Sequence, residues 1–265
     1  MIDLHCHILP GLDDGPITTK DALEMCRMAV DDGIQTIVAT PHMLDSMFPV
    51  DRQAILEGVQ ELSQILREES IPLQLLPGAD VHLDQAMPSY LAQGKLVTLA
   101  DLRRHLLVEL PRDIIPEGLG ELLFQVQLKG VTPIITHPER NVAIEQNPAL
   151  LNDLIRVGSL TQITAGSLTG AFGSRVRLFT LRLLEARAVH LVSTDAHDTS
   201  RRSPRLSEAR RVVEEELGSE EAERIFVERP VRILEGAHVE APEPLVDQAT
   251  PKRKQSFWKK LFSYS

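Results

Sequence analysis

The sequence predicts an α/β fold built on parallel strands, and three observations support this prediction. Short β-branched runs alternate with longer helical patterns, as in proteins made of successive strand–helix units. The chain has 265 residues, 43% of them hydrophobic, which suffices for one barrel or for two small domains. Seven strand–helix repeats are one fewer than a standard TIM barrel needs. An irregular seven-stranded barrel therefore fits the count better than an open doubly wound sheet, although periodicity alone leaves both open.

The predicted strands are short, apolar and rich in Val, Ile and Thr: Ile2–Ile8, Thr36–Thr40, Leu73–Val81, His105–Leu110, Thr132–His137, Leu160–Ala165 and His190–Ala196. The predicted helices lie between and after them: Thr18–Asp32, Asp51–Glu69, Glu117–Lys129, Pro148–Val157, Ser174–Ala186 and Ser203–Leu217. Thr18 or Thr19 before an acidic turn, and Ser203 followed by Pro204, are helix-start signals. Four glycines just past helical stretches predict C-terminal caps: Gly33, Gly130, Gly158 and Gly218.

Composition argues against several classes of function. Aromatic residues make up 4% of the chain and the formal net charge is −10, which argues against nucleic-acid binding. Cys6 and Cys26 are too few for a disulfide framework, so we expect a reducing, cytoplasmic location. Neither a signal peptide nor an apolar run of eighteen residues occurs, and we expect a soluble protein.

Metal-ligand residue types collect where the predicted strands end. In chain order these residues are His5 and His7, His42, Asp80 and His82, Glu109, His137, and Asp195 with His197. The one exception is the predicted strand that ends near Thr164. The carboxyl ends of parallel strands form the active-site rim of such folds, so the pattern predicts a metal site. A His-x-His pair alone would be equally consistent with two surface histidines.

The first predicted strand illustrates the geometry. Residues two apart on a strand project to the same face, so His5 and His7 converge while Leu4 and Cys6 face the other way. Asp13 and Asp14 follow them. Glu109 stands in an otherwise apolar strand, where an unpaired carboxylate would be costly. His82 is either a ligand or a neighbour of the ligands. Three histidines lie away from this rim and are interpreted as structural or surface residues: His105, His190 and His238.

Mixed imidazole and carboxylate ligands, without a thiolate set, suit more than one ion of Mn, Fe or Zn. Such a cluster hydrolyses phosphoesters, amides or lactones. Arg140, Arg201 and Arg202 closely follow predicted ligands and favour phosphate, because guanidinium pairs with phosphate oxygens. A cysteine phosphatase is excluded because neither cysteine is followed by arginine six residues later. No Gly-x-x-x-x-Gly-Lys motif occurs, which excludes a P-loop.

The motifs IDLHCHILPGLDDGP, ATPHM, GADVHL, LVELP, ITHPERN and STDAH resemble the PHP (polymerase and histidinol phosphatase) superfamily. More narrowly, they resemble its bacterial manganese-dependent protein-tyrosine phosphatases, which act in capsule and exopolysaccharide regulation. The resemblance covers Met1 to about Gly236 and implies a distorted (β/α)7 TIM-like barrel of the PHP type. It also implies a phosphotyrosine protein as substrate, namely a membrane-associated tyrosine kinase.

The resemblance implies three Mn²⁺ ions, with Fe or Zn as alternatives, held by nine residues. His5, His7 and Asp195 would hold the first ion, and Asp80 would bridge to the second, which Glu109 and His137 complete. The third would be held by Asp14, His42 and His197. Arg140 would contact the substrate phosphate, joined by Arg202. The family pattern has glutamate where this chain has Asp80, and the shorter carboxylate would lengthen the bridge or alter the metal preference.

Our mechanistic hypothesis is in-line attack on phosphorus by a metal-bridging hydroxide, without a covalent enzyme intermediate. Two alternatives stay open. One is a small-molecule phosphatase of the histidinol-phosphate type, and the other is a catalytically silent regulator that binds a kinase.

The composition changes after Gly236. We expect residues 1–240 to form the phosphatase barrel and residues 241–265 to form a Pro-rich linker and a tail. The tail, PKRKQSFWKKLFSYS, is basic and aromatic. Two interpretations are equally open: a solvated basic run, or weak attachment to an acidic partner or to an anionic membrane surface. Attachment to the membrane would place the enzyme at its inner face.

Overall fold

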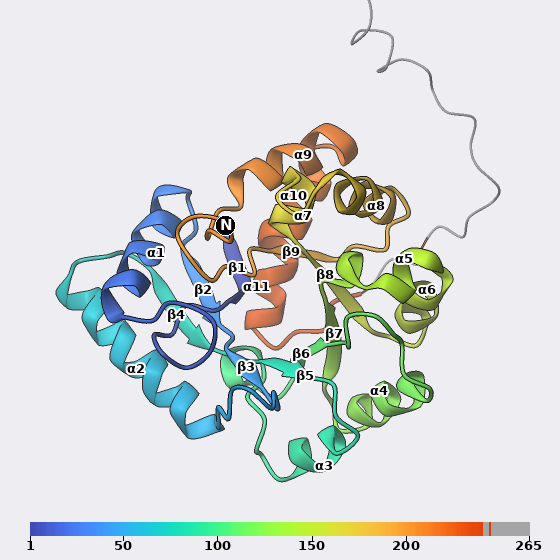
Figure 1. Cartoon of the computed structure of the whole chain (residues 1–265), viewed down its shortest axis with the longest axis horizontal. Coiled ribbons are helices and arrows are strands. Elements are labelled where there is room, and N and C mark those ends of the chain that lie inside the picture. The colour runs from blue at the N-terminus through green and yellow to red at the C-terminus, as the bar shows by residue number, and fades with distance from the viewer. Residues whose placement is uncertain (241–243, 245–265) are drawn as a thin grey trace, which may run out of the picture.

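The protein is described here from a computed structural model, which covers residues 1–240 and residue 244. Parallel strands lie at the centre and helices surround them (Figure 1). The strands are β1 (Ile2–Cys6), β2 (Thr36–Ala39), β3 (His42–Met43), β4 (Gln74–Pro77), β5 (Asp80–His82), β6 (His105–Glu109), β7 (Thr132–Thr136), β8 (Leu160–Thr164) and β9 (Leu191–Ser193). The helices are α1 (Thr19–Asp31), α2 (Arg52–Glu68), α3 (Met87–Ala92), α4 (Leu119–Gln127), α5 (Val142–Gln146), α6 (Ala149–Arg156), α7 (Ala165–Thr169), α8 (Ser174–Glu185), α9 (Ser207–Leu217), α10 (Ser219–Glu223) and α11 (Arg229–Leu234).

The strands form two parallel sheets that meet at β1. One has the order β1-β2-β4 and the other the order β3-β5-β6-β7-β8-β9. Beyond β9, Ala196 bridges to Cys6, and the amide of His7 donates to the Ala196 carbonyl at 2.9 Å. These contacts confirm the predicted α/β class with parallel strands.

The predicted strand Leu73–Val81 is two strands, β4 and β5, separated at Gly78. A Cβ atom on Gly78 would lie 2.5 Å from the Val38 side chain, so only glycine permits this close approach. The short strand β3 was not predicted, because it holds only two residues directly after Pro41.

Apolar side chains pack on both sides of the strands, in two clusters. The inner cluster contains one residue from each of six strands, together with Ile233 of α11. The strand residues are Leu4, Val38, Leu107, Ile134, Leu160 and Leu191. A larger cluster fills the space between the strands and the outer helices. Two residues farther along β6 to β8, the chain has Glu109, Thr136 and Gln162 in place of apolar residues. The interior is therefore apolar where the strands begin and polar where they end.

The helix-start predictions had mixed outcomes. Thr18 caps α1 and forms a capping box with Asp21, as expected. The predicted start at Ser203 is wrong, since α9 begins at Ser207. The carboxylate of Asp32 accepts from the amides of Leu206 and Ser207 at 2.6 and 2.8 Å and so caps this helix from a distant segment. A local pattern contains no signal for such a cap.

The predicted tail segment, residues 251–265, and most of the predicted linker lie outside the described residues. Within the described part of the chain, no helix is both long enough and apolar enough to cross a membrane.

Candidate metal centre

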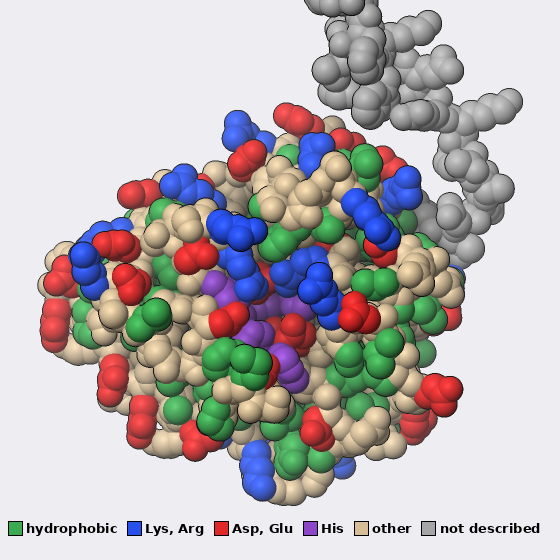
Figure 2. Space-filling model, viewed as in Figure 1, with side chains coloured by type: hydrophobic (Ala, Val, Ile, Leu, Met, Phe, Trp, Pro, Cys, Tyr) green, Lys and Arg blue, Asp and Glu red, His purple; other side chains and the backbone are tan. Residues whose placement is uncertain are grey.

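Histidine and acidic side chains gather in a hollow on the face seen in Figure 2, beneath a group of basic side chains. The cavity there has a volume of about 470 Å³, and its polar lining includes Asp14, His42, Glu109, His137, Arg140 and Arg202. Glu109 ends β6, His137 directly follows β7, and His42 begins the short strand β3. The others lie in segments that follow β1, β7 and β9. The hollow is therefore the rim that the sequence predicted.

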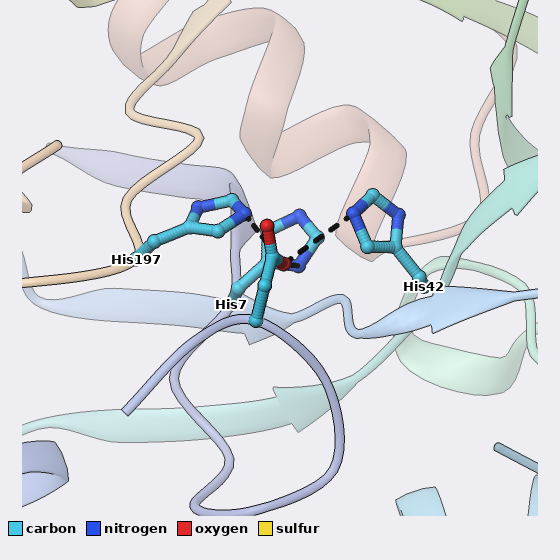
Figure 3. Close-up of side chains that lie close together, drawn as sticks. His7, His42 and His197 are labelled. Atoms are coloured by element: carbon cyan, nitrogen blue, oxygen red, sulfur yellow. Dashed lines mark ion pairs between the residues drawn. The ribbon is translucent and has the colours of Figure 1, made fainter. Parts of the chain in front are cut away.

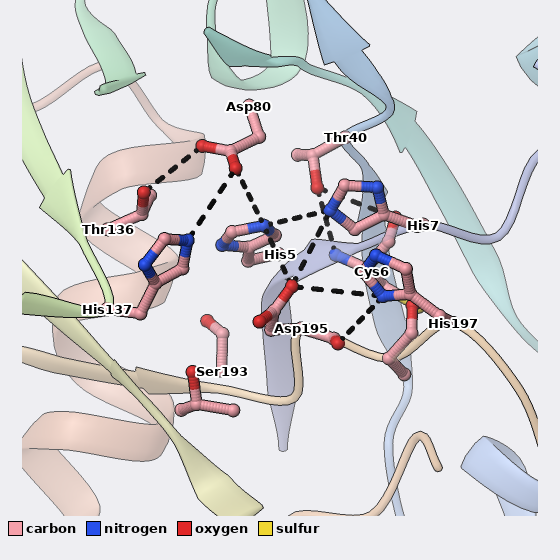
Figure 4. A network of polar contacts seen from close by, with 12 residues as sticks. His5, Cys6, His7, Thr40, Asp80, Thr136, His137, Ser193, Asp195 and His197 are labelled. Atoms are coloured by element: carbon pink, nitrogen blue, oxygen red, sulfur yellow. Dashed lines mark hydrogen bonds and ion pairs between the residues drawn. The ribbon is translucent and has the colours of Figure 1, made fainter. Parts of the chain in front are cut away.

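The end of β1 brings His5 and His7 together, as expected (Figure 4). Their Nε2 atoms are 3.1 Å apart, and His5 Nε2 lies 3.4 Å from Asp195 Oδ1 and 3.5 Å from Asp80 Oδ2. Ligand atoms bound at about 2.1 Å around one cation are separated by similar distances. The prediction that Leu4 and Cys6 share the opposite face is wrong. They lie in different apolar clusters, because the β1–β2 register shifts between Asp3 and Cys6.

A second group forms around β5, β6 and the end of β7. His137 Nε2 lies 3.4 Å from Glu109 Oε1 and 4.0 Å from Asp80 Oδ2. His137 and Asp195 adopt positive φ angles of 34° and 52°. Such backbone is strained by about 1–3 kcal/mol per residue and concentrates at functional sites.

A third group has Asp14 at its centre. Asp14 Oδ1 lies 3.1 Å from His197 Nε2, 3.5 Å from His42 Nε2 and 4.0 Å from His7 Nδ1. Figure 3 shows the three labelled imidazoles converging from separate segments. The structure thus brings together all nine predicted ligands in three adjoining groups.

The donor atoms fit bound cations. Several buried nitrogen and oxygen atoms of the centre have no hydrogen-bond partner among the described residues: His42 Nδ1, Asp80 Oδ2, Glu109 Oε2 and His197 Nε2. A buried polar atom without a partner costs about 1–3 kcal/mol. Imidazole nitrogens and carboxylate oxygens that face a shared space in this way are the donor set of a Mn, Fe or Zn site.

Two further side chains orient the first imidazoles. The Nδ1 atom of His5 lies 2.7 Å from Gln162 Oε1, and the Nδ1 atom of His7 lies 2.6 Å from Asp13 Oδ2. A proton on Nδ1 satisfies each contact and leaves the Nε2 lone pair facing the centre. Thr136 Oγ1 similarly donates to Asp80 Oδ1 at 3.2 Å.

Burial and charge set the protonation states. Burial lowers the pKa of His5 well below its usual value and that of His7 to about 4, with His197 adding to the effect on His7. Both imidazoles are therefore neutral near pH 7 and have lone pairs to donate. Burial raises the pKa of Asp80 well above its ordinary value, and the nearby Glu109 raises it further. A cation bound in this space would instead lower the pKa of Asp80.

Both predicted arginines contact one carboxylate. Arg140 Nη2 donates to Asp195 Oδ2 at 2.6 Å, and Arg202 Nη2 lies 2.7 Å from Asp195 Oδ1. Although burial opposes it, Arg140, His5 and Arg202 hold the pKa of Asp195 well below its usual range. The guanidinium of Arg140 also lies over the Phe172 ring, 4.9 Å from its centroid. Arg201, the third predicted arginine, is exposed and lines a neighbouring cavity.

A family profile for capsular polysaccharide synthesis proteins, CpsB/CapC, matches residues 1–235. The chain belongs to this family. The tyrosine-protein phosphatase YwqE of Bacillus subtilis (strain 168) is 43% identical over 220 residues, covering 83% of this chain and 86% of YwqE. The tyrosine-protein phosphatase CpsB of Streptococcus pneumoniae is 28% identical over 239 residues, covering 88% of this chain and 98% of CpsB.

A solved structure of this CpsB/CapC group gives a TM-score of 0.89 at 40% sequence identity, covering 92% of this chain and 98% of that chain. It comes from work on YwqE of Bacillus subtilis and CpsB of Streptococcus pneumoniae, described there as unique metal-dependent tyrosine phosphatases.

Sequence reasoning missed two residues that orient His5 and His7 in this CpsB/CapC member. Asp13 was noticed only as a neighbour of Asp14, and Gln162 lies on the strand that was expected to contribute nothing. Gln162 is fully buried within the run LTQIT, and a polar residue in a buried strand was the available signal. His105 and His190 are buried away from the centre and His238 is exposed, in agreement with their interpretation as structural or surface residues.

Proposed function

We propose that this chain is a metal-dependent protein-tyrosine phosphatase of bacterial capsule or exopolysaccharide synthesis. The observation that carries the proposal is the convergence of nine His, Asp and Glu side chains, whose contacts within the three groups span 3.1–4.0 Å. The activities of YwqE and CpsB support tyrosine phosphate as the substrate group.

Three Mn²⁺ ions are the proposed cofactors. His5, His7 and Asp195 would hold the first, Glu109 and His137 the second with Asp80 between them, and Asp14, His42 and His197 the third. When bound, the metals supply Lewis acidity toward phosphate oxygens and activate water for hydrolysis.

Arg140 and Arg202 are the proposed phosphate-binding residues. Each guanidinium has five N–H donors, and the contact with Asp195 engages one of them. The buried Nε atom of Arg202 has no hydrogen-bond partner among the described residues. Both side chains line the cavity, so their remaining donors can bind phosphate oxygens and stabilise charge that develops there.

The charge around the hollow supports a protein substrate over a small molecule. Although the chain is acidic overall, Arg112 lines the centre, and Arg201, Arg205 and Arg211 line a neighbouring cavity of about 330 Å³. Figure 2 shows basic side chains above the hollow. This arrangement would attract a phosphotyrosine segment of a membrane-associated tyrosine kinase.

We also propose that the two sheets form one distorted (β/α)7 barrel over residues 1–240. The contacts between β1 and the segment after β9 support closure. A cytoplasmic location fits the two buried free cysteines. The basic and aromatic composition of residues 251–265 supports weak binding to the inner membrane surface, to be tested by liposome cosedimentation with and without these residues.

The deciding experiment compares a phosphotyrosine peptide with histidinol phosphate, using chelated protein with and without added Mn²⁺. We expect Mn-dependent hydrolysis of the peptide and little of the small molecule. Full activity without metal would end the proposed chemistry, and preference for histidinol phosphate would favour the small-molecule alternative. No turnover at saturating metal would favour the silent regulator.

A further inference from the structure

His82 lies beside the metal centre without belonging to its nine proposed ligands. On β5 it is two residues beyond Asp80, so both side chains project to the same face of the strand. The parallel register pairs His82 with Glu109 on β6 and pairs His42 with Asp80. The fold itself therefore places His82 next to Glu109.

The two oxygens of Glu109 face different neighbours. Oε1 lies 3.4 Å from His137 Nε2, within the second proposed group. Oε2 lies 2.5 Å from His82 Nε2 and 3.4 Å from His42 Nδ1, on the other side. His82 Nε2 also lies 3.3 Å from Asp45 Oδ2. One carboxylate thus borders two separate clusters of donor atoms.

The contacts within this outer cluster are close but fall outside hydrogen-bond geometry. Among the described residues, His42 Nδ1, His82 Nε2 and Glu109 Oε2 have no partner of suitable geometry, although each atom is buried. These three residues offer ligand atoms within 4.8 Å of one another. Two imidazole nitrogens and a carboxylate oxygen that meet without hydrogen bonding form a typical donor set for a divalent transition metal.

We propose that His42 Nδ1, His82 Nε2 and Glu109 Oε2 bind a fourth divalent cation at the outer edge of the centre, with Asp45 orienting His82 beside it. The side chains of His82 and Glu109 are 35% and 20% exposed, whereas those of His5 and His7 are fully buried, so this ion exchanges more readily than the first ion. The inference rests on the proposed metal centre, because Glu109 and His42 belong to both.

The test is Mn²⁺ binding to the chelated full-length protein, measured by equilibrium dialysis and by the EPR signal of free Mn²⁺. For the wild type we expect three tight equivalents and one weaker equivalent. His82→Gln should lose only the weaker one, and Asp45→Asn should weaken it by about tenfold because a carboxylate that orients His82 is lost. His238→Gln, at an exposed histidine outside the centre, is the matched control and should bind like the wild type.

The other outcomes separate the two proposals. If His82→Gln keeps the fourth equivalent, or if the wild type binds only three, the outer site does not exist. If His82→Gln also loses tight equivalents, His82 only positions Glu109 and the fourth cation is likewise refuted. A wild type that binds no Mn²⁺ would overturn the proposed function itself.

Discussion

The Nδ1 atom of His7 lies 2.6 Å from Oδ2 of Asp13, a residue six positions later that is not one of the proposed ligands. The same carboxylate accepts from the amides of Gly15 and His42, at 3.0 Å each. Asp13 thereby links the loop after β1 to the start of β3. It also fixes the imidazole of His7 with Nε2 toward the centre, so it positions ligands from two groups.

We expect Asp13→Asn to lower Mn²⁺ affinity by about 10- to 100-fold, because partners that orient a ligand contribute on this scale. The variant keeps the size of the side chain and one acceptor oxygen but loses the charge that favours a proton on His7 Nδ1. Isothermal titration calorimetry with Mn²⁺ measures the change. Asp153→Asn, at an exposed carboxylate paired with Arg156, is the control. Equal Mn²⁺ affinities for the two variants would contradict a positioning role for Asp13.

Arg140→Lys should lower kcat/KM for a phosphotyrosine peptide by about 10²- to 10³-fold, the usual cost of losing one preorganised donor in the transition state. Lysine keeps the charge but loses the planar fork and the stacking on Phe172. Arg175→Lys tests the specificity of the effect, because Arg175 is 76% exposed and pairs with Glu145. A drop of similar size in both variants would show that the loss of activity is not specific to the geometry of Arg140.

The convergence of the strand-end His, Asp and Glu residues could be predicted because its signal is local. A buried strand followed by His, Asp or Glu is visible in the sequence, and parallel topology brings the ends of such strands together. Eight of the nine predicted ligands lie in the centre for this reason, and the ninth, Asp14, follows β1 by eight residues and was predicted from the family resemblance. The main helices were found in the same way, from a period of 3.6 residues.

The features that were missed depend on tertiary contacts. The cap of α9 comes from Asp32, and the orientation of His5 depends on Gln162, which is 157 positions away in the chain. The break between β4 and β5 follows from the close approach of Gly78 to Val38. Helices α3, α5, α7 and α10 are too short to show a period, since each holds only five or six residues.

Removing metal should destabilise the protein as well as silence it. Asp80 and Asp195 are buried. Without cations, burial opposes the charged form of Asp80, and the charge of Asp195 is met by Arg140 and Arg202. Mn²⁺ at 100 times its dissociation constant would stabilise the folded state by about 2.7 kcal/mol per site. We therefore expect the Tm of chelated protein to rise by several degrees when Mn²⁺ is added, and the Asp14→Asn variant to gain less. An unchanged Tm in the wild type would contradict metal binding by the folded state.

His190 gives a pH dependence that is independent of the metal centre. It is buried, and its Nδ1 atom accepts from the Thr161 amide at 3.0 Å. Burial, aided by Arg229, lowers the pKa of His190 to about 3, whereas the unfolded chain has the ordinary value near 6.5. Between these values the unfolded state binds more protons than the folded state. The contribution of His190 to stability is therefore complete above about pH 6.5 and is lost as the pH falls toward 3.

His190→Asn keeps an acceptor for the Thr161 amide but removes the titration. Between about pH 7.5 and pH 5, the free energy of unfolding should therefore fall less in this variant than in the wild type, by about 2 kcal/mol, since each pH unit between the two pKa values is worth about 1.4 kcal/mol. Urea unfolding of chelated protein at both pH values measures the difference. The exposed His238, changed to Asn, should leave the wild-type dependence intact. If the free energy of unfolding of His190→Asn changes with pH as it does in the wild type, then His190 binds a proton equally well in the folded and unfolded states.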